Sequence, residues 1–146
     1  MKYAGYIDIN KPLQEVADFF ANSKNQKMWQ DGFVKKEQIS GNDREDGAVI
    51  KLFYKLGNRD MILIETVTSN NLPQSFEANY HHRHMDNSMK CTFTPRDPEK
   101  TRYHYEFEYT RISWIMPKLM AILFPGMYRK QGEKWIQQFK SAIENK

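Results

Sequence analysis

The sequence contains one cysteine among 146 residues and no long apolar run. A single cysteine excludes an intramolecular disulfide, so a reducing compartment and a cytoplasmic location are expected. The most apolar stretch, residues 112–125, is interrupted by Pro117 and Lys118. A spanning helix needs about 20 apolar residues, so stable membrane insertion is not expected. Residues 1–9 lack the apolar core of a signal peptide, and none is expected.

Motifs for nucleophilic and nucleotide chemistry are missing as well. The chain has no G-x-S-x-G, no G-x-x-x-x-G-K, no G-x-G-x-x-G and no C-x-x-C. The formal net charge is +4, with lysine and arginine spread along the chain, whereas nucleic-acid binding usually requires a clustered basic face. The sequence therefore predicts no nucleic-acid partner and no cofactor. It favours binding over catalysis and leaves an enzyme open.

Aromatic residues are plentiful and regularly placed. Tyr103, Tyr105, Phe107 and Tyr109 alternate with polar or charged residues. This period of two predicts a strand with one buried face, and that face is a column of four rings. Because buried hydroxyl groups need hydrogen-bond partners, a wall of phenols suits a surface that faces a pocket better than a dry core.

The rest of the chain indicates one α+β domain over residues 1–146. Leu13, Val16, Ala17 and Phe20 have helical spacing after a first strand, and a further short helical piece is expected over 26–30. Polar turns then separate an antiparallel series of strands, and a long amphipathic helix ends the chain. That helix is expected to cover the apolar face of a single curved sheet. The expected strands are 3–9, 34–40, 48–56, 61–68, 75–85, 88–94 and 101–111.

This order of elements resembles the helix-grip fold of the START-like (SRPBCC) superfamily, which includes polyketide cyclase-like and Bet v 1-like proteins. The resemblance implies a sheet wrapped around the terminal helix, with a hydrophobic cavity for lipids, sterols, polyketides or other apolar ligands. The matching positions are the strand ending at Ile9, Pro12, Val16, Phe20, Trp29, Gly47-Ala48-Val49-Ile50, Glu65-Thr66-Val67, Leu72-Pro73, the strand to Tyr109, and Trp135, Phe139 and Ile143.

Aromatic and polar residues on the expected concave side are the candidates for a ligand cavity. One interpretation is a pocket walled by rings and a few hydroxyl groups. The other is a filled core in which the tyrosines satisfy one another. The candidate lining is Tyr54, Phe76, Tyr80, His82, Tyr103, Tyr105, Phe107, Trp135 and Phe139.

A histidine cluster and a set of carboxylates offer other chemistry. His82 and His84 share a strand face, but the sequence supplies no third or fourth metal ligand near them, so no metal site is predicted. An inward His82 beside Tyr80 would be a polar anchor or an acid/base group. The carboxylate set is Glu65, Glu77, Glu106 and Glu108. Glu106 and Glu108 lie opposite the tyrosine column and are expected to face solvent, which argues against a paired-acid hydrolase that uses this pair.

The methionine-rich segment 112–127 has three interpretations: a lid over the cavity, a homodimer contact, or packing against the sheet. Three hypotheses of function follow from the whole sequence. The first is a small cytosolic protein that binds an apolar or aromatic ligand. The second is an enzyme of the cyclase, dehydratase or isomerase type that uses the same cavity. The third is a protein-interaction module.

Overall fold

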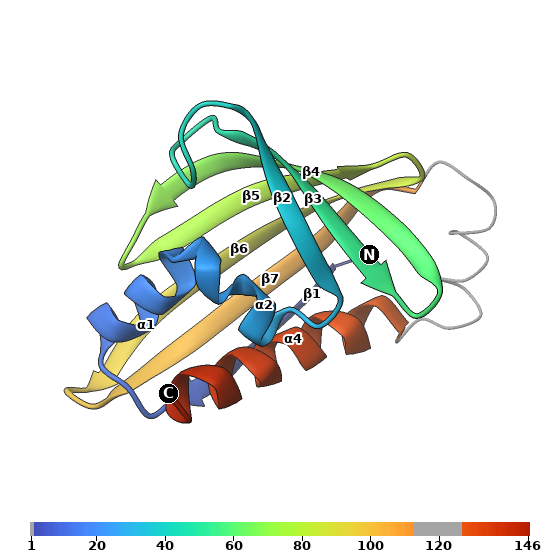
Figure 1. Cartoon of the computed structure of the whole chain (residues 1–146). Coiled ribbons are helices and arrows are strands. Elements are labelled where there is room, and N and C mark those ends of the chain that lie inside the picture. The colour runs from blue at the N-terminus through green and yellow to red at the C-terminus, as the bar shows by residue number, and fades with distance from the viewer. Residues whose placement is uncertain (1, 113–126) are drawn as a thin grey trace.

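The computed structural model describes residues 2–112 and 127–146 (Figure 1). The described elements follow the order that the sequence predicts: a strand, short helices, six further strands and a long helix. They are β1 (Lys2–Ile9), α1 (Leu13–Ala21), the 3₁₀ turn η1 (Ser23–Asn25), α2 (Gln26–Trp29), β2 (Phe33–Ser40), β3 (Val49–Leu56), β4 (Arg59–Asn71), β5 (Ser75–His82), β6 (Met85–Asp97), β7 (Lys100–Ile112) and α4 (Met127–Glu144).

The strands form one antiparallel sheet in the order β1-β7-β6-β5-β4-β3-β2. Bulges interrupt the register in three of the strand pairs, for example between Val67 and Ser69 of β4. A bulge bends its strand and increases the local twist. The sheet therefore curves, and Figure 1 shows α4 running along its concave side. The predicted α+β helix-grip fold is confirmed.

Helix α4 packs through the apolar stripe that its sequence predicts. Ile136, Phe139 and Ile143 are each at most 4% exposed. Gly132 lies on the same stripe over β1, where an added Cβ would stand 2.7 Å from the Tyr3 hydroxyl oxygen. The close approach of helix and sheet at this point requires glycine.

Helix α1 closes one end of the concave side. It buries Val16, Ala17, Phe19 and Phe20. At the C-terminal end of α4, Lys140 donates to the Asp8 carbonyl at 2.6 Å, and Glu144 accepts from the backbone N–H of Asn10 at 2.9 Å. These bonds fix the end of β1 to the end of α4.

None of the helices in the described part of the chain combines the length and apolar character needed to cross a membrane. Most of the segment 112–127, with its lid, dimer and packing interpretations, lies outside the described residues.

Candidate functional site

The concave side of the sheet divides into two halves. The half beneath α1, here called the closed half, is filled by aromatic rings. Phe20 contacts Phe76 and Phe93 with ring centroids 5.2 and 5.6 Å apart, and Tyr103 contacts Phe139 at 5.4 Å. All five side chains are at most 2% exposed. These edge-to-face contacts leave the closed half packed as an ordinary protein core.

The other half, here called the open half, lies toward the β3–β4 and β5–β6 hairpins and the start of α4 (Figure 1). Its apolar side chains belong to the same core clusters, yet each keeps part of its surface accessible. Accessible apolar surface on the concave side is what a ligand can cover. The open half consists of Met61, Leu63, Tyr80, Phe107, Tyr109 and Trp135.

Buried and partly buried polar groups lie between the two halves. They are here called the polar layer, which consists of Gln26, Gln30, Tyr54 and Glu65, together with the hydroxyl group of Tyr80. The Tyr54 hydroxyl donates to Gln30 Oε1 at 2.9 Å, and Gln26 Nε2 donates to the same oxygen at 2.7 Å. Tyr54 and Gln26 are 2% and 4% exposed. The ring of Tyr54 stacks on Trp135 of α4 at 5.5 Å. Helix α2, strand β3 and helix α4 thus meet around one satisfied phenol.

Tyr80 and Glu65 form a second polar contact in this layer. The Tyr80 hydroxyl donates to Glu65 Oε2 at 2.7 Å. Glu65 is 4% exposed because it occupies an inward position of β4, between the inward residues Leu63 and Val67. A carboxyl group is seldom buried so deeply without a partner, so the phenol is essential to its placement.

Burial keeps these phenols neutral. Desolvation, followed by the nearby Glu65 carboxylate, raises the pKa of Tyr80 and of Tyr54 well above the ordinary value of 10.0. Desolvation likewise raises the pKa of Tyr103. These hydroxyl groups are therefore hydrogen-bond donors at neutral pH and not phenolate bases.

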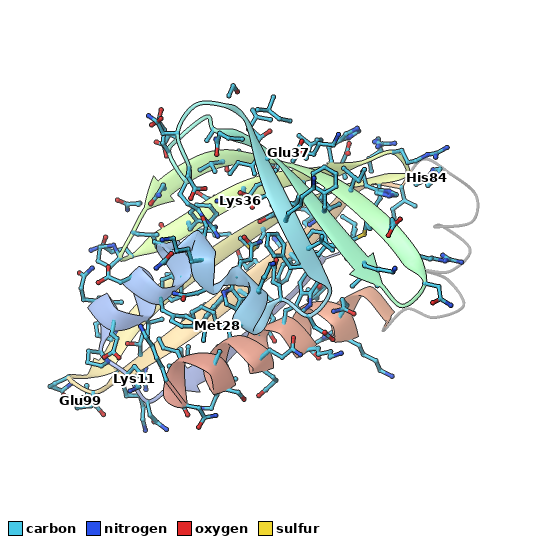
Figure 2. The ribbon with its side chains drawn as sticks, viewed as in Figure 1. Lys11, Met28, Lys36, Glu37, His84 and Glu99 are labelled. Carbon is cyan, nitrogen blue, oxygen red and sulfur yellow. The ribbon has the colours of Figure 1, made fainter. Side chains whose placement is uncertain are left out.

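His82 lies near the β5–β6 hairpin, and Figure 2 shows the neighbouring His84 at the tip. His82 Nδ1 accepts from the backbone N–H of His84 at 3.2 Å. Desolvation, and then the charge of His84, lowers the pKa of His82 below 6.5. Its imidazole is thus neutral at pH 7, and the Tyr80 hydroxyl bonds to Glu65 rather than to His82.

The nine candidate lining residues therefore fall into separate groups. Phe76, Tyr103 and Phe139 lie in the closed half, and Tyr80, Phe107 and Trp135 lie in the open half. Tyr54 belongs to the polar layer. Tyr105 is 8% exposed, and its hydroxyl lies against Gly5 of β1. His82 stands apart at the hairpin.

Metal-binding side chains do not gather in this part of the molecule. Among residues 2–112 and 127–146, no three His, Cys, Asp or Glu side chains come together as a metal site requires. Cys91 is fully buried, and desolvation raises its thiol pKa to about 12, as expected for an inert cysteine. Glu106 and Glu108 are exposed on the convex face, as predicted.

A depression of about 210 Å³ lies on the convex face. Charged residues of both signs line much of it, including Lys2, Glu77, Lys90 and Glu106. A site for a drug-sized apolar molecule is enclosed by hydrophobic and aromatic walls. The charged lining of this depression does not suit an apolar ligand. The concave side therefore remains the candidate site.

The positions of three residues of the site were not predicted from the sequence. The inward position of Glu65 was readable, because Met61, Leu63, Glu65 and Val67 share one parity of β4. Gln26 lies on a helix of four residues, too short for a periodic signal. Arg44, whose guanidinium carbon lies 5.1 Å from the ring centroid of Phe20, belongs to the polar turn between β2 and β3, where no periodicity assigns a direction to a side chain.

No family model matches the chain, and no curated protein matches it. Solved structures do match across nearly all of it. A START superfamily protein from Mycobacterium smegmatis has a TM-score of 0.76 at 9% identity and covers 99% of this chain and 97% of its own. The ZhuI aromatase/cyclase from Streptomyces sp. R1128 has a TM-score of 0.81 at 9% identity, covering 99% and 93%.

The Bet v 1 allergen Ara h 8.0201 has a TM-score of 0.71 at 8% identity and covers 100% of this chain and 99% of its own. Identities this low establish the fold alone. The chain has the START-like helix-grip fold that its sequence resembles.

Proposed function

We propose that the protein binds a small apolar or aromatic ligand between the open half of the sheet and α4. The observation that supports this is the partly exposed apolar surface on a concave face whose other end is closed by packed rings. Burial of ligand surface supplies the affinity, at about 25 cal/mol per Å² before the costs of association. Neutral phenols of the polar layer supply orientation.

The neutral fluorescent probe N-phenyl-1-naphthylamine tests the proposal directly. We expect saturable binding of one probe per chain. Leu63→Gln places an amide on the concave face and is expected to weaken binding at least tenfold. Ile62→Gln makes the same change on the neighbouring residue of β4, which is 43% exposed on the other face, and is expected to leave binding unchanged.

Two results would contradict the proposal: absence of saturable binding to the folded protein, or equal weakening by both substitutions. Native mass spectrometry of the purified protein adds an independent measurement, because an apolar ligand retained from expression would appear as a discrete mass increment.

Catalysis in the same space is the second candidate. The observation that favours it is the Tyr80–Glu65 contact at 2.7 Å, which couples a phenol to a buried carboxyl group. Catalysis can be tested by extracting a ligand retained from expression and incubating it with the ligand-free protein. Conversion by the wild type and not by Tyr80→Phe would support catalysis, and recovery of the unchanged molecule would argue for binding alone.

A further inference from the structure

Arg44 directs its charge toward the interior from the loop between β2 and β3. Its guanidinium carbon lies 5.1 Å from the ring centroid of Phe20 and 5.3 Å from that of Phe76. Both rings are at most 2% exposed, so the charged group stands on the core and not on the outer surface of the loop. Arginine over aromatic faces is held by cation–π attraction, and its N–H edges stay available to a ligand.

Among residues 2–112 and 127–146, this guanidinium has no partner of opposite charge. No carboxylate oxygen of a described residue lies within 4.0 Å of it, and its nitrogens make no hydrogen bond to a described residue. Two arginines of β7 are paired: Arg102 binds Asp8 through two hydrogen bonds, and Arg111 binds Asp86. A half-buried guanidinium without a carboxylate is poorly compensated for its desolvation.

The loop is built to hold Arg44 in this position. Arg44 has φ of +65°, a left-handed conformation that a residue with a side chain adopts only when its surroundings impose it. Asn70 Nδ2 donates to the Arg44 carbonyl at 2.6 Å. The preceding residue, Asp43, accepts from Ser23 and Lys36, each at 2.5 Å. Figure 2 labels Lys36 of β2 above the short helices in that view, and Ser23 lies in η1 between them.

The charge of Arg44 reaches the polar layer. This charge opposes the desolvation that raises the pKa of Tyr54 and of Tyr80, the two phenols of this layer, and also the pKa of Tyr103 in the closed half. This electrostatic effect agrees with the position of the guanidinium on the rings of Phe20 and Phe76, which places the charge on the concave side. A ligand bound in the open half that extends into the polar layer therefore approaches this charge.

A second unsatisfied donor lies next to the same ring. The indole Nε1 of Trp29 is buried and has no acceptor in the described part of the protein. Trp29 stacks on Phe20, with ring centroids 6.1 Å apart. Two groups that only donate, Arg44 and Trp29, thus border Phe20, and neither has an acceptor among the described side chains and backbone. This chemistry matches a guest that brings oxygen acceptors.

We infer that the ligand carries an anionic group, a carboxylate or a sulfonate, which pairs with the Arg44 guanidinium while its apolar part occupies the open half. The inference rests on the proposed function and names the class of ligand. Arginine suits this role because its planar fork matches two oxygens of a carboxylate or sulfonate at once.

Two probes that differ in one anionic group separate the inference from the proposed function. 1-Anilinonaphthalene-8-sulfonate is N-phenyl-1-naphthylamine with a sulfonate added. We expect Arg44→Gln to weaken binding of the sulfonate probe about tenfold or more and to change binding of the neutral probe less than about twofold. Arg44→Lys keeps the charge without the fork and is expected to give an intermediate loss.

Arg96→Gln is the matched control, because Arg96 is exposed on the β6–β7 hairpin and makes no ion pair with a described residue. It is expected to leave both affinities unchanged. A competition experiment on the wild-type protein does not depend on whether a variant folds. Decanoate is expected to displace the neutral probe at least fivefold more effectively than 1-decanol.

Equal effects of Arg44→Gln on both probes, or equal displacement by decanoate and decanol, would overturn the anionic-ligand inference and leave the proposed function standing. Absence of binding for both probes would overturn both. Loss confined to the sulfonate probe, together with preference for decanoate, would establish Arg44 as the anion-recognising residue.

Discussion

At the scale of residues, the buried polar groups of the interior depend on hydrogen bonds to one another. Tyr54 satisfies its hydroxyl on Gln30, and Tyr80 satisfies its own on Glu65. Because a buried polar group is costly only when unpaired, these contacts let a carboxyl group and two phenols lie within an apolar sheet. The interior can therefore present donors and acceptors to a guest without losing its fold.

The Tyr80–Glu65 hydrogen bond predicts a specific stability change. Tyr80→Phe removes the donor to a carboxyl group that is 4% exposed, and we expect the free energy of unfolding to fall by about 1–3 kcal/mol. Denaturant titration measures the change. Tyr6→Phe is the control, because Tyr6 is 57% exposed, and it is expected to stay within about 0.5 kcal/mol of the wild type.

A double-mutant cycle isolates this interaction. In a Glu65→Leu background, Tyr80→Phe is expected to cost clearly less than in the wild type, because the carboxyl partner is already absent. Additive costs of the two substitutions would show that the Tyr80–Glu65 bond does not stabilise the protein.

At the scale of elements, the fit between α4 and β1 depends on the missing side chain of Gly132. Alanine favours a helix by about 1 kcal/mol over glycine. Its Cβ would nevertheless stand 2.7 Å from the Tyr3 hydroxyl oxygen, on a ring stacked on Phe107 at 5.1 Å. We expect Gly132→Ala to lower the melting temperature, because the steric conflict outweighs the gain in helix propensity.

Removal of the Tyr3 oxygen relieves that conflict. In a Tyr3→Phe background, Gly132→Ala is expected to be neutral or stabilising, since the nearest remaining atoms lie 3.7 Å or more from the added Cβ. Thermal unfolding of the four proteins in the cycle measures the coupling. Equal destabilisation in both backgrounds would contradict the steric account.

The pairing of β1 with β7 predicts a pH dependence. Arg102, hydrogen-bonded to Asp8 through two nitrogens at 2.8 and 3.1 Å, holds the pKa of that carboxyl below its ordinary value of 3.8. A carboxyl group with a lowered folded-state pKa stabilises the fold above its unfolded pKa, and the contribution disappears as the pH falls through the folded value.

Arg102→Gln is therefore expected to reduce the free energy of unfolding at pH 7 and to have little effect at about pH 2. Denaturant titrations at both values measure the difference. Arg59→Gln serves as the control, because Arg59 is exposed and makes no ion pair with a described residue. A deficit for Arg102→Gln that stays constant with pH would contradict the ion-pair account.

Elements also show how far sequence patterns reach. Alternation predicts the inward faces of the strands, and Tyr103 and Tyr105 of β7 are buried accordingly. Periodicity cannot separate the closed half from the open half, because that depends on which strand end α1 covers. Nor can it orient Arg44, since a loop conformation with positive φ follows from tertiary contacts such as the Asn70 bond.

At the scale of the whole molecule, stability and binding are predicted to reside in different halves of one interior. The closed half is a packed aromatic core, and the open half keeps accessible apolar surface. Regions that bind ligands generally contribute less to stability than fully packed ones. Substitutions in the two halves should therefore affect different properties.

The same change, phenylalanine to leucine, tests this division at two sites. Phe139 is fully buried in the closed half, and Phe139→Leu is expected to cost about 1–3 kcal/mol in the free energy of unfolding with unchanged probe affinity per folded molecule. Phe107 lies in the open half and is partly exposed. Phe107→Leu is expected to cost less than about 1 kcal/mol and to weaken the neutral probe about three- to tenfold.

Denaturant titration measures the free energy of unfolding of each variant, and probe titration measures its affinity for the neutral probe. A crossed pattern, with stability lost at Phe139 and affinity lost at Phe107, follows only if the ligand occupies the open half. If Phe139→Leu weakened the probe as much as Phe107→Leu did, the ligand would have to enter between rings that are fully buried in the ligand-free fold. The closed half would then have to open on binding, and its packing could not be the reason that the ligand stays near the start of α4.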